Sequence, residues 1–234
     1  MARKDRVPNP PKRSQGPQKR ASTPSDDRNR MRAVAILAAG AVALVGAVLA
    51  IVLLTGADGD DGEQAALESA GCTLQSFPAL ANTPDHSDVP TLETKPKWNS
   101  SPPTSGPHYG ANAVWGAYDE EVPLVQTVHN LEHGGVVIHY GPDVPEAEVT
   151  ALRDWYADLD DPNGLIISPL STNKARITLS AWTAPETVSS SGAGELGWLA
   201  GCTKFDADAF EAFIDTHRYK GPERLTPEQL APGT

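Results

Sequence analysis

Sulfur-containing side chains are scarce in this chain, whose 234 residues include two cysteines and two methionines. Both methionines, Met1 and Met31, precede a long apolar run, so the residues after that run have no thioether for a methionine-type copper(I) site. The cysteines, Cys72 and Cys202, lie far apart in the sequence, which excludes a CxxC redox pair.

Basic residues are scarce after the apolar run as well. The 32 residues before the run carry ten Lys and Arg against three Asp, a net charge of +7. The residues after it carry nine Lys and Arg against 27 Asp and Glu, a net charge of −18. Nucleic acids and anionic lipids select for basic faces, so this acidic part is not expected to bind nucleic acid. An acidic surface suits cations, and it also keeps an exported domain soluble.

The apolar run, residues 33–54, contains only Ala, Val, Ile, Leu and Gly. As a helix, its 22 residues would span about 33 Å, which matches a hydrocarbon core of about 30 Å. Arg28, Arg30 and Arg32 flank its first end, so the positive-inside rule places the N-terminus in the cytoplasm and the later residues outside. A signal peptide cleaved near residues 55–57 is the alternative, and it also exports the rest of the chain.

If the residues after the apolar run are exported, the two cysteines are expected to form a disulfide bond. Free thiols are disfavoured in an oxidising compartment, so we expect a disulfide between Cys72 and Cys202. The alternative is a pair of buried, reduced thiols.

Composition divides the chain into five segments. Residues 1–32 contain almost no large apolar residues, which predicts disorder. Prolines recur over residues 77–107 and favour an irregular wrap around a core. We expect a disordered basic cytoplasmic tail over 1–32, a transmembrane helix over 33–54, an acidic linker over 55–70, an exported α+β domain over 71–219, and a frayed, Pro-rich C-terminal tail over 220–234.

Hydrophobic periodicity predicts alternating helices and strands in the exported part. Leu124, Val128 and Leu131 share one helical face, with Pro123 suited to the first turn and Gly134 to the end. This pattern favours one compact α+β domain with a small mixed or antiparallel sheet packed by helices, preceded by one transmembrane helix. The expected elements are an extended piece over 72–77, a helix over 123–133, a strand over 135–140, a helix over 145–159, strands over 164–168 and 175–182 joined as a hairpin, and a helix capped by Asp206.

Histidines concentrate in two segments, and their spacing suggests a metal site. On a helix, His129 and His133 would lie on one face at i and i+4, about 5–6 Å apart at Cβ. Glu132 lies between them, and His108 follows a glycine–proline loop from which it can supply another ligand. Neutral imidazoles suit zinc or copper(II).

Other interpretations of these segments stay open. The histidines can instead form hydrogen bonds that brace the fold. The string His129 to His133 also fits H-x-x-E-H, the inverted zinc-peptidase pattern, with Glu132 as general base. Thr104-Ser105-Gly106 with His108 suggests a serine nucleophile but lacks the G-x-S-x-G pattern. Of the remaining histidines, we expect His139 to pack in a strand and His217 to be partly buried in a helix. We expect His86 to lie in a solvated loop.

The same segments carry a family resemblance. PPTSGPH (102–108), WGAY (115–118) and VHNLEHG (128–134) resemble motifs of bacterial single-pass membrane proteins of unassigned function, common in high-GC Gram-positive bacteria. The resemblance covers roughly residues 70 to 220. It implies membrane location and one exported domain, and it implies no established activity, substrate or cofactor.

The sequence therefore predicts a membrane-anchored extracytoplasmic binding domain, favoured over an enzyme. The expected ligand is a divalent transition metal held by His129 and His133, with His108 and Glu132. A non-metal interaction module of the cell envelope, with structural histidines, is the alternative, and a metal-dependent hydrolase is a third. The predicted partner is the membrane, crossed once, and no protein partner is indicated.

The predicted orientation can be tested with fusions. Because the basic flank precedes the apolar run, a reporter enzyme that is active only outside the cytoplasm should work when fused after Thr234 and fail when fused before Arg3. The opposite pattern would contradict the orientation, and a mature N-terminus at Asp58 would contradict an uncleaved anchor.

Overall fold

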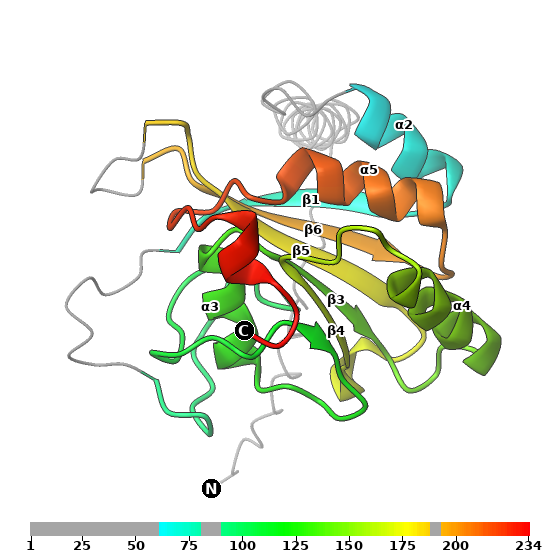
Figure 1. The fold of residues 1–234 in the computed structure, drawn as a ribbon, viewed down its shortest axis with the longest axis horizontal. Helices are drawn as coiled ribbons and strands as arrows, with labels where there is room; N and C mark the ends of the chain where they lie inside the picture. The colour runs from blue at the N-terminus through cyan, green and yellow to red at the C-terminus, as the bar shows by residue number, and fades with distance from the viewer. Residues whose placement is uncertain (1–60, 81–89, 188–192) are drawn as a thin grey trace, which may run out of the picture. The chain divides into compact units, whose positions relative to one another are not determined.

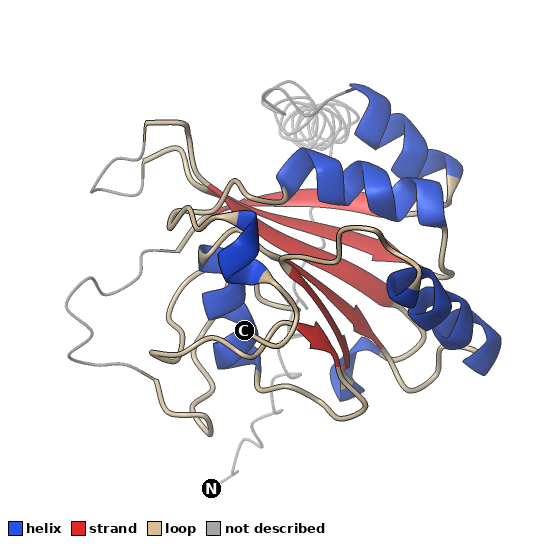
Figure 2. Cartoon of the chain, viewed as in Figure 1, coloured by secondary structure: helices blue, strands red, loops and turns tan. Residues whose placement is uncertain are grey.

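A computed structural model describes residues 61–80, 90–187 and 193–234, which form an α+β unit on one six-stranded mixed sheet (Figures 1 and 2). This confirms the predicted α+β domain with a mixed sheet. In chain order the elements are α2 (Asp61–Ser69), β1 (Thr73–Pro78), β2 (Gly116–Ala117), α3 (Leu124–Glu132), β3 (Val136–Tyr140), α4 (Glu146–Ala157), β4 (Leu165–Pro169), the 3₁₀ turn η1 (Ser171–Asn173), β5 (Ile177–Thr183), β6 (Leu196–Cys202), α5 (Ala207–His217) and η2 (Pro227–Leu230).

The predictions for residues 1–32 and 33–54, and for the linker up to residue 60, lie outside the described residues. Among the helices that the structure describes, none is long and apolar enough to cross a membrane.

The sheet has the strand order β1-β6-β5-β3-β4-β2. Strands β3 and β4 are parallel neighbours, and two parallel strands need a crossover connection, which α4 provides. Strand β5 pairs antiparallel with the other edge of β3. The short loop between β4 and β5 predicted that these two strands form a hairpin. This prediction is wrong, because β3 lies between them in the sheet.

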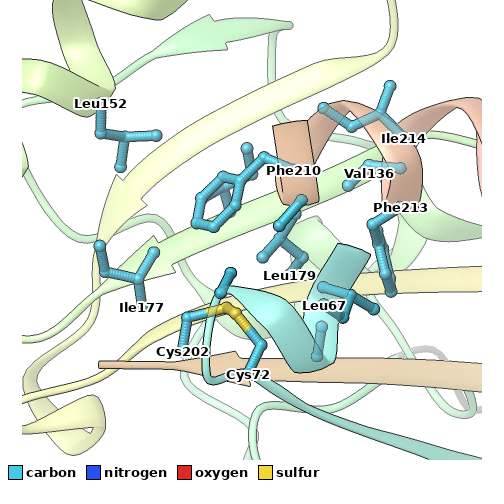
Figure 3. Packing of buried hydrophobic residues seen from close by; sticks show 14 of the residues in the cluster. Leu67, Cys72, Val136, Leu152, Ile177, Leu179, Cys202, Phe210, Phe213 and Ile214 are labelled. Carbon is cyan, nitrogen blue, oxygen red and sulfur yellow. A yellow bond between two sulfur atoms is a disulfide. The ribbon is translucent and has the colours of Figure 1, made fainter. Parts of the chain in front are cut away.

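Helices and loops cover both faces of the sheet. On one face, Val136 and Ile138 of β3 join a core cluster with side chains from α2, α4 and α5 (Figure 3). On the other face, Val137 joins a cluster that includes Leu131 of α3. Central strands that are buried on both faces are continuously apolar, which is why the segment over 136–138 shows no polar alternation.

Two segments expected outside the domain are part of it. Residues 61–69, placed in the acidic linker, form α2, in which Leu67 is 1% exposed. Residues 220–234, expected as a frayed tail, pack on the domain through Leu230, whose carbonyl accepts a hydrogen bond from Gly164 N at 2.8 Å. Leu230 is fully buried, so its apolar contacts fix this Pro-rich segment although its composition predicts fraying.

The Cys72–Cys202 disulfide is present, as predicted. Cys72 precedes β1 and Cys202 ends β6, and the pairing of Thr73 with Gly201 brings the two cysteines together at the sheet edge. Figure 3 shows the bond among the core side chains, near Leu67.

Removal of this bond should destabilise the domain. The closed loop has a sequence separation of 130, for which chain entropy gives about 5 kcal/mol, although measured losses are usually about 2–5 kcal/mol. The double variant Cys72→Ala/Cys202→Ala should therefore unfold at clearly lower urea concentration than the parent, as followed by tryptophan fluorescence. An unchanged midpoint would show that the bond does not constrain the unfolded chain.

Candidate metal centre

Helix α3 carries three of the predicted site residues at its C-terminal end. Its apolar face packs into the core through Val128 and Leu131, which are almost fully buried. His129 and Glu132 are buried beside that face, and His133 follows as the C-cap residue. A carboxylate at the C-terminal end of a helix faces the negative end of the helix dipole, so Glu132 needs a positive partner.

The loop before α3 supplies His108. Gly106 has φ +104°, and a Cβ there would lie 2.9 Å from Leu80 Cβ, so the turn requires glycine. At Gly197 of β6, a Cβ would lie only 2.1 Å from Thr104 Oγ1. Glycine in β6 therefore lets the loop approach the sheet, and the loop fixes where His108 lies.

Backbone carbonyls set the tautomers of two histidines. His108 Nδ1 lies 2.8 Å from Gly106 O, and His129 Nδ1 lies 2.7 Å from Tyr109 O. A carbonyl oxygen only accepts, so each Nδ1 must carry a proton. In the neutral form of each ring, Nε2 then carries the lone pair. A hydrogen bond from the other ring nitrogen to a carbonyl is a usual way in which metal-binding histidines are oriented.

The first of these Nε2 atoms meets a carboxylate, and the second meets the Nε2 atom of His133. His108 Nε2 lies 3.0 Å from Glu132 Oε2, and His129 Nε2 lies 3.1 Å from His133 Nε2. The rings of His108 and His129 meet edge to face, with centroids 4.9 Å apart. One ligand atom from each of His108, His129 and Glu132 can be chosen so that all three lie within 4.8 Å of one another.

These separations suit one small ion. A tetrahedral zinc ion with bonds of about 2.0–2.1 Å separates its ligand atoms by about 3.3 Å. The contact between His108 and Glu132 is close to that value. Relative to the 4.8 Å limit, the widest pair must close by at most about 1.5 Å, which a side-chain rotation can provide.

The buried carboxylate changes the proton affinity of the histidine beside it. Burial opposes a proton on His108, but the hydrogen bond and charge of Glu132, together with the Gly106 carbonyl and the charge of Glu223, outweigh burial and raise the pKa of His108 above 6.5. Burial and the neighbouring His129 instead lower the pKa of His133. A metal ion must therefore displace a favourably held proton from His108.

A fifth residue, Glu223, lies beside His133, and the sequence did not indicate it. Glu223 Oε2 lies 3.2 Å from His133 Nε2. Its backbone N–H donates to Glu132 O at 3.0 Å, so the C-terminal segment is bound to the end of α3. A Cβ at Gly221 would lie 2.3 Å from Gly134 N, so two glycines let the backbones meet here.

Glu195 is a further carboxylate near the cluster. Its Oε2 accepts a hydrogen bond from Trp182 Nε1 at 3.0 Å, and the Trp182 ring lies edge to face with His108. Burial raises the pKa of Glu195, and the charge of Glu132 raises it further. The predicted residues His108, His129, His133 and Glu132 are thus brought together, with Glu195 and Glu223 at the periphery.

The remaining histidines lie elsewhere. His217 Nε2 lies 2.8 Å from Glu63 Oε1 and joins α5 to α2. His139 is buried in β3, as expected, and His86 lies outside the described residues. Ser105 Oγ accepts a hydrogen bond from Leu80 N at 3.0 Å, which fixes the loop.

A family pattern described as "Protein of unknown function (DUF3105)" matches residues 91–230. The chain belongs to this family. The match reaches beyond residue 220, the expected limit of the resemblance, and contains every residue of the cluster from His108 to Glu223. No curated protein and no solved structure matches the chain.

The buried His139 should make stability depend on pH. Within the described residues neither of its ring nitrogens has a hydrogen-bond partner, and burial lowers its pKa to about 4. The folded pKa is below the unfolded one, so the unfolded chain binds more protons, and stability is lost as pH falls from about 6.5 to about 4. This group alone should account for about 3 kcal/mol over that range.

The matched variant is His139→Leu, which removes the titrating ring and leaves a buried apolar side chain. Its urea midpoint should be at least that of the parent near neutral pH, and it should decrease much less on acidification. Equal pH dependence in the two proteins would contradict a buried, neutral His139.

Proposed function

We propose that this domain binds one divalent transition-metal ion, zinc or copper(II), through His108, His129 and Glu132. We further propose that it does so outside the cytoplasm, anchored by residues 33–54. The observation that carries the metal proposal is the pair of carbonyl-bound Nδ1 atoms of His108 and His129. With those protons fixed, Nε2 is the ring nitrogen of each histidine that remains to bind a cation. One ligand atom from each histidine and one from the Glu132 carboxylate lie within 4.8 Å of one another.

The donor set supports these metals. Two imidazoles and a carboxylate match the ligands of zinc, and imidazole nitrogen also suits copper(II). A hard ion such as magnesium prefers oxygen ligands and is disfavoured here. His133 lies next to this set, because its Nε2 lies 3.1 Å from His129 Nε2.

A structural role for the histidines is the competing function. The contact between His108 and Glu132 supports it, because an imidazolium and a carboxylate satisfy each other without a metal. The hydrolase alternative has less support: Glu132, which would serve as general base, is grouped with the candidate ligand atoms.

Metal binding can be tested on the full-length protein in mild detergent. Titration with zinc or copper(II) should reach about one ion per chain, and bound ion should raise the unfolding temperature until a chelator removes it. Affinity should fall on acidification, and because the pKa of His108 is raised, the fall should begin above pH 6.5. Glu132→Gln keeps the side-chain shape and should weaken binding by at least about 100-fold.

Glu211→Gln is the matched control, because Glu211 is an exposed α5 residue that accepts a hydrogen bond from Trp155. It should bind metal as the parent does. If the folded parent shows no saturable site, and Glu132→Gln changes stability alone, the structural role replaces the metal proposal.

A further inference from the structure

The donors of the cluster are ordered by depth. The Glu223 side chain is 56% exposed, that of His133 is 13% exposed, and that of His108 is 2% exposed. His129, between His133 and His108, is buried. One line of side chains therefore leads from solvent to the buried ligands.

Along the outer part of this line, the distance between successive donor atoms is close to the distance between two ligand atoms on one metal ion. Glu223 Oε2 to His133 Nε2 is 3.2 Å, and His133 Nε2 to His129 Nε2 is 3.1 Å. Ligand atoms on one tetrahedral ion lie about 3.3 Å apart. An ion can thus bind Glu223 and His133 together, and then His133 and His129 together. It would lose its water ligands one at a time along this outer part of the line.

The outermost donor is held in place by the fold. The backbone N–H of Glu223 donates to Glu132 O, and Tyr219 N donates to Gly134 O at 2.7 Å. Two backbone hydrogen bonds therefore bind this segment to the helix that carries the inner ligands. An exposed carboxylate chosen only for solubility would need no such attachment.

We propose that Glu223 and His133 are entry ligands, which capture the metal ion from solution and pass it to His129, His108 and Glu132. This inference rests on the proposed metal binding. An entry ligand lowers the barrier for binding and for release equally, so it changes both rates and leaves the equilibrium constant unchanged. A permanent ligand instead slows release and tightens binding.

The test is stopped-flow zinc exchange on the full-length protein, with a fluorescent zinc chelator reporting uptake and release. Glu223→Gln should slow association and dissociation by the same factor, about tenfold, while Kd changes less than twofold. Glu223→Asp keeps the charge and withdraws the carboxylate by one methylene, and it should slow both rates too. Glu228 is an exposed residue of η2, so Glu228→Gln removes an equal charge elsewhere on the surface and should leave both rates unchanged.

Three outcomes would overturn the entry role alone. Weaker binding caused by faster release alone would make Glu223 a permanent ligand. Equal slowing in Glu223→Gln and Glu228→Gln, with normal rates in Glu223→Asp, would indicate general attraction by negative charge. Parent-like rates in Glu223→Gln would remove its role while leaving the buried site intact. Failure of the parent itself to bind zinc would overturn the proposed function and the entry role together.

Discussion

A carboxylate is buried at the end of a helix, and much of the site depends on it. Glu132 is 6% exposed and ends α3, where the helix dipole disfavours negative charge. Leaving such a group without its partner costs roughly 3–5 kcal/mol. A positive charge must therefore stand beside it, and His108 can meet this need by holding a proton or by sharing a cation with it. The loop that carries His108 packs against Leu80 at Gly106 and against β6 at Gly197.

The C-terminal segment completes the site by backbone contact. Gly134 has φ +85°, and its place against Gly221 leaves no room for a side chain on either residue. At Gly135, a Cβ would lie 2.4 Å from the Trp115 ring. The two glycines after the histidine motif therefore have separate roles: the first receives residues 219–223 and the second receives a tryptophan. The approach at Gly134 places Glu223 beside His133.

Local signals in the sequence were sufficient for some of these features. The spacing of Leu124, Val128 and Leu131 predicted α3, and the helix then fixed His129 and His133 as neighbours. Strand β6 was missed because Gly197 and Gly201 interrupt its apolar pattern, and its pairing with β1 and β5 is set by tertiary contacts. Glu223 was missed for a similar reason: proline-rich composition predicts fraying, whereas burial of Leu230 holds the segment in place. Gly134, which we interpreted only as the end of the helix, was the available signal of this close backbone approach.

The contact between His129 and His133 bears on the choice between a proposed binding site and a brace. A brace needs one donor and one acceptor, and the pair of His108 and Glu132 already supplies both. In neutral His129 the Nε2 atom has no proton, because the ring's one N–H is on Nδ1 and donates to Tyr109 O. In the 3.1 Å contact, His133 Nε2 must then be the donor to His129 Nε2. The same His133 Nε2 also faces the Glu223 carboxylate. Two carboxylates and three imidazoles thus converge beside the end of α3. A divalent cation bound there would replace the protons that these groups share, which is the physical basis of the metal proposal.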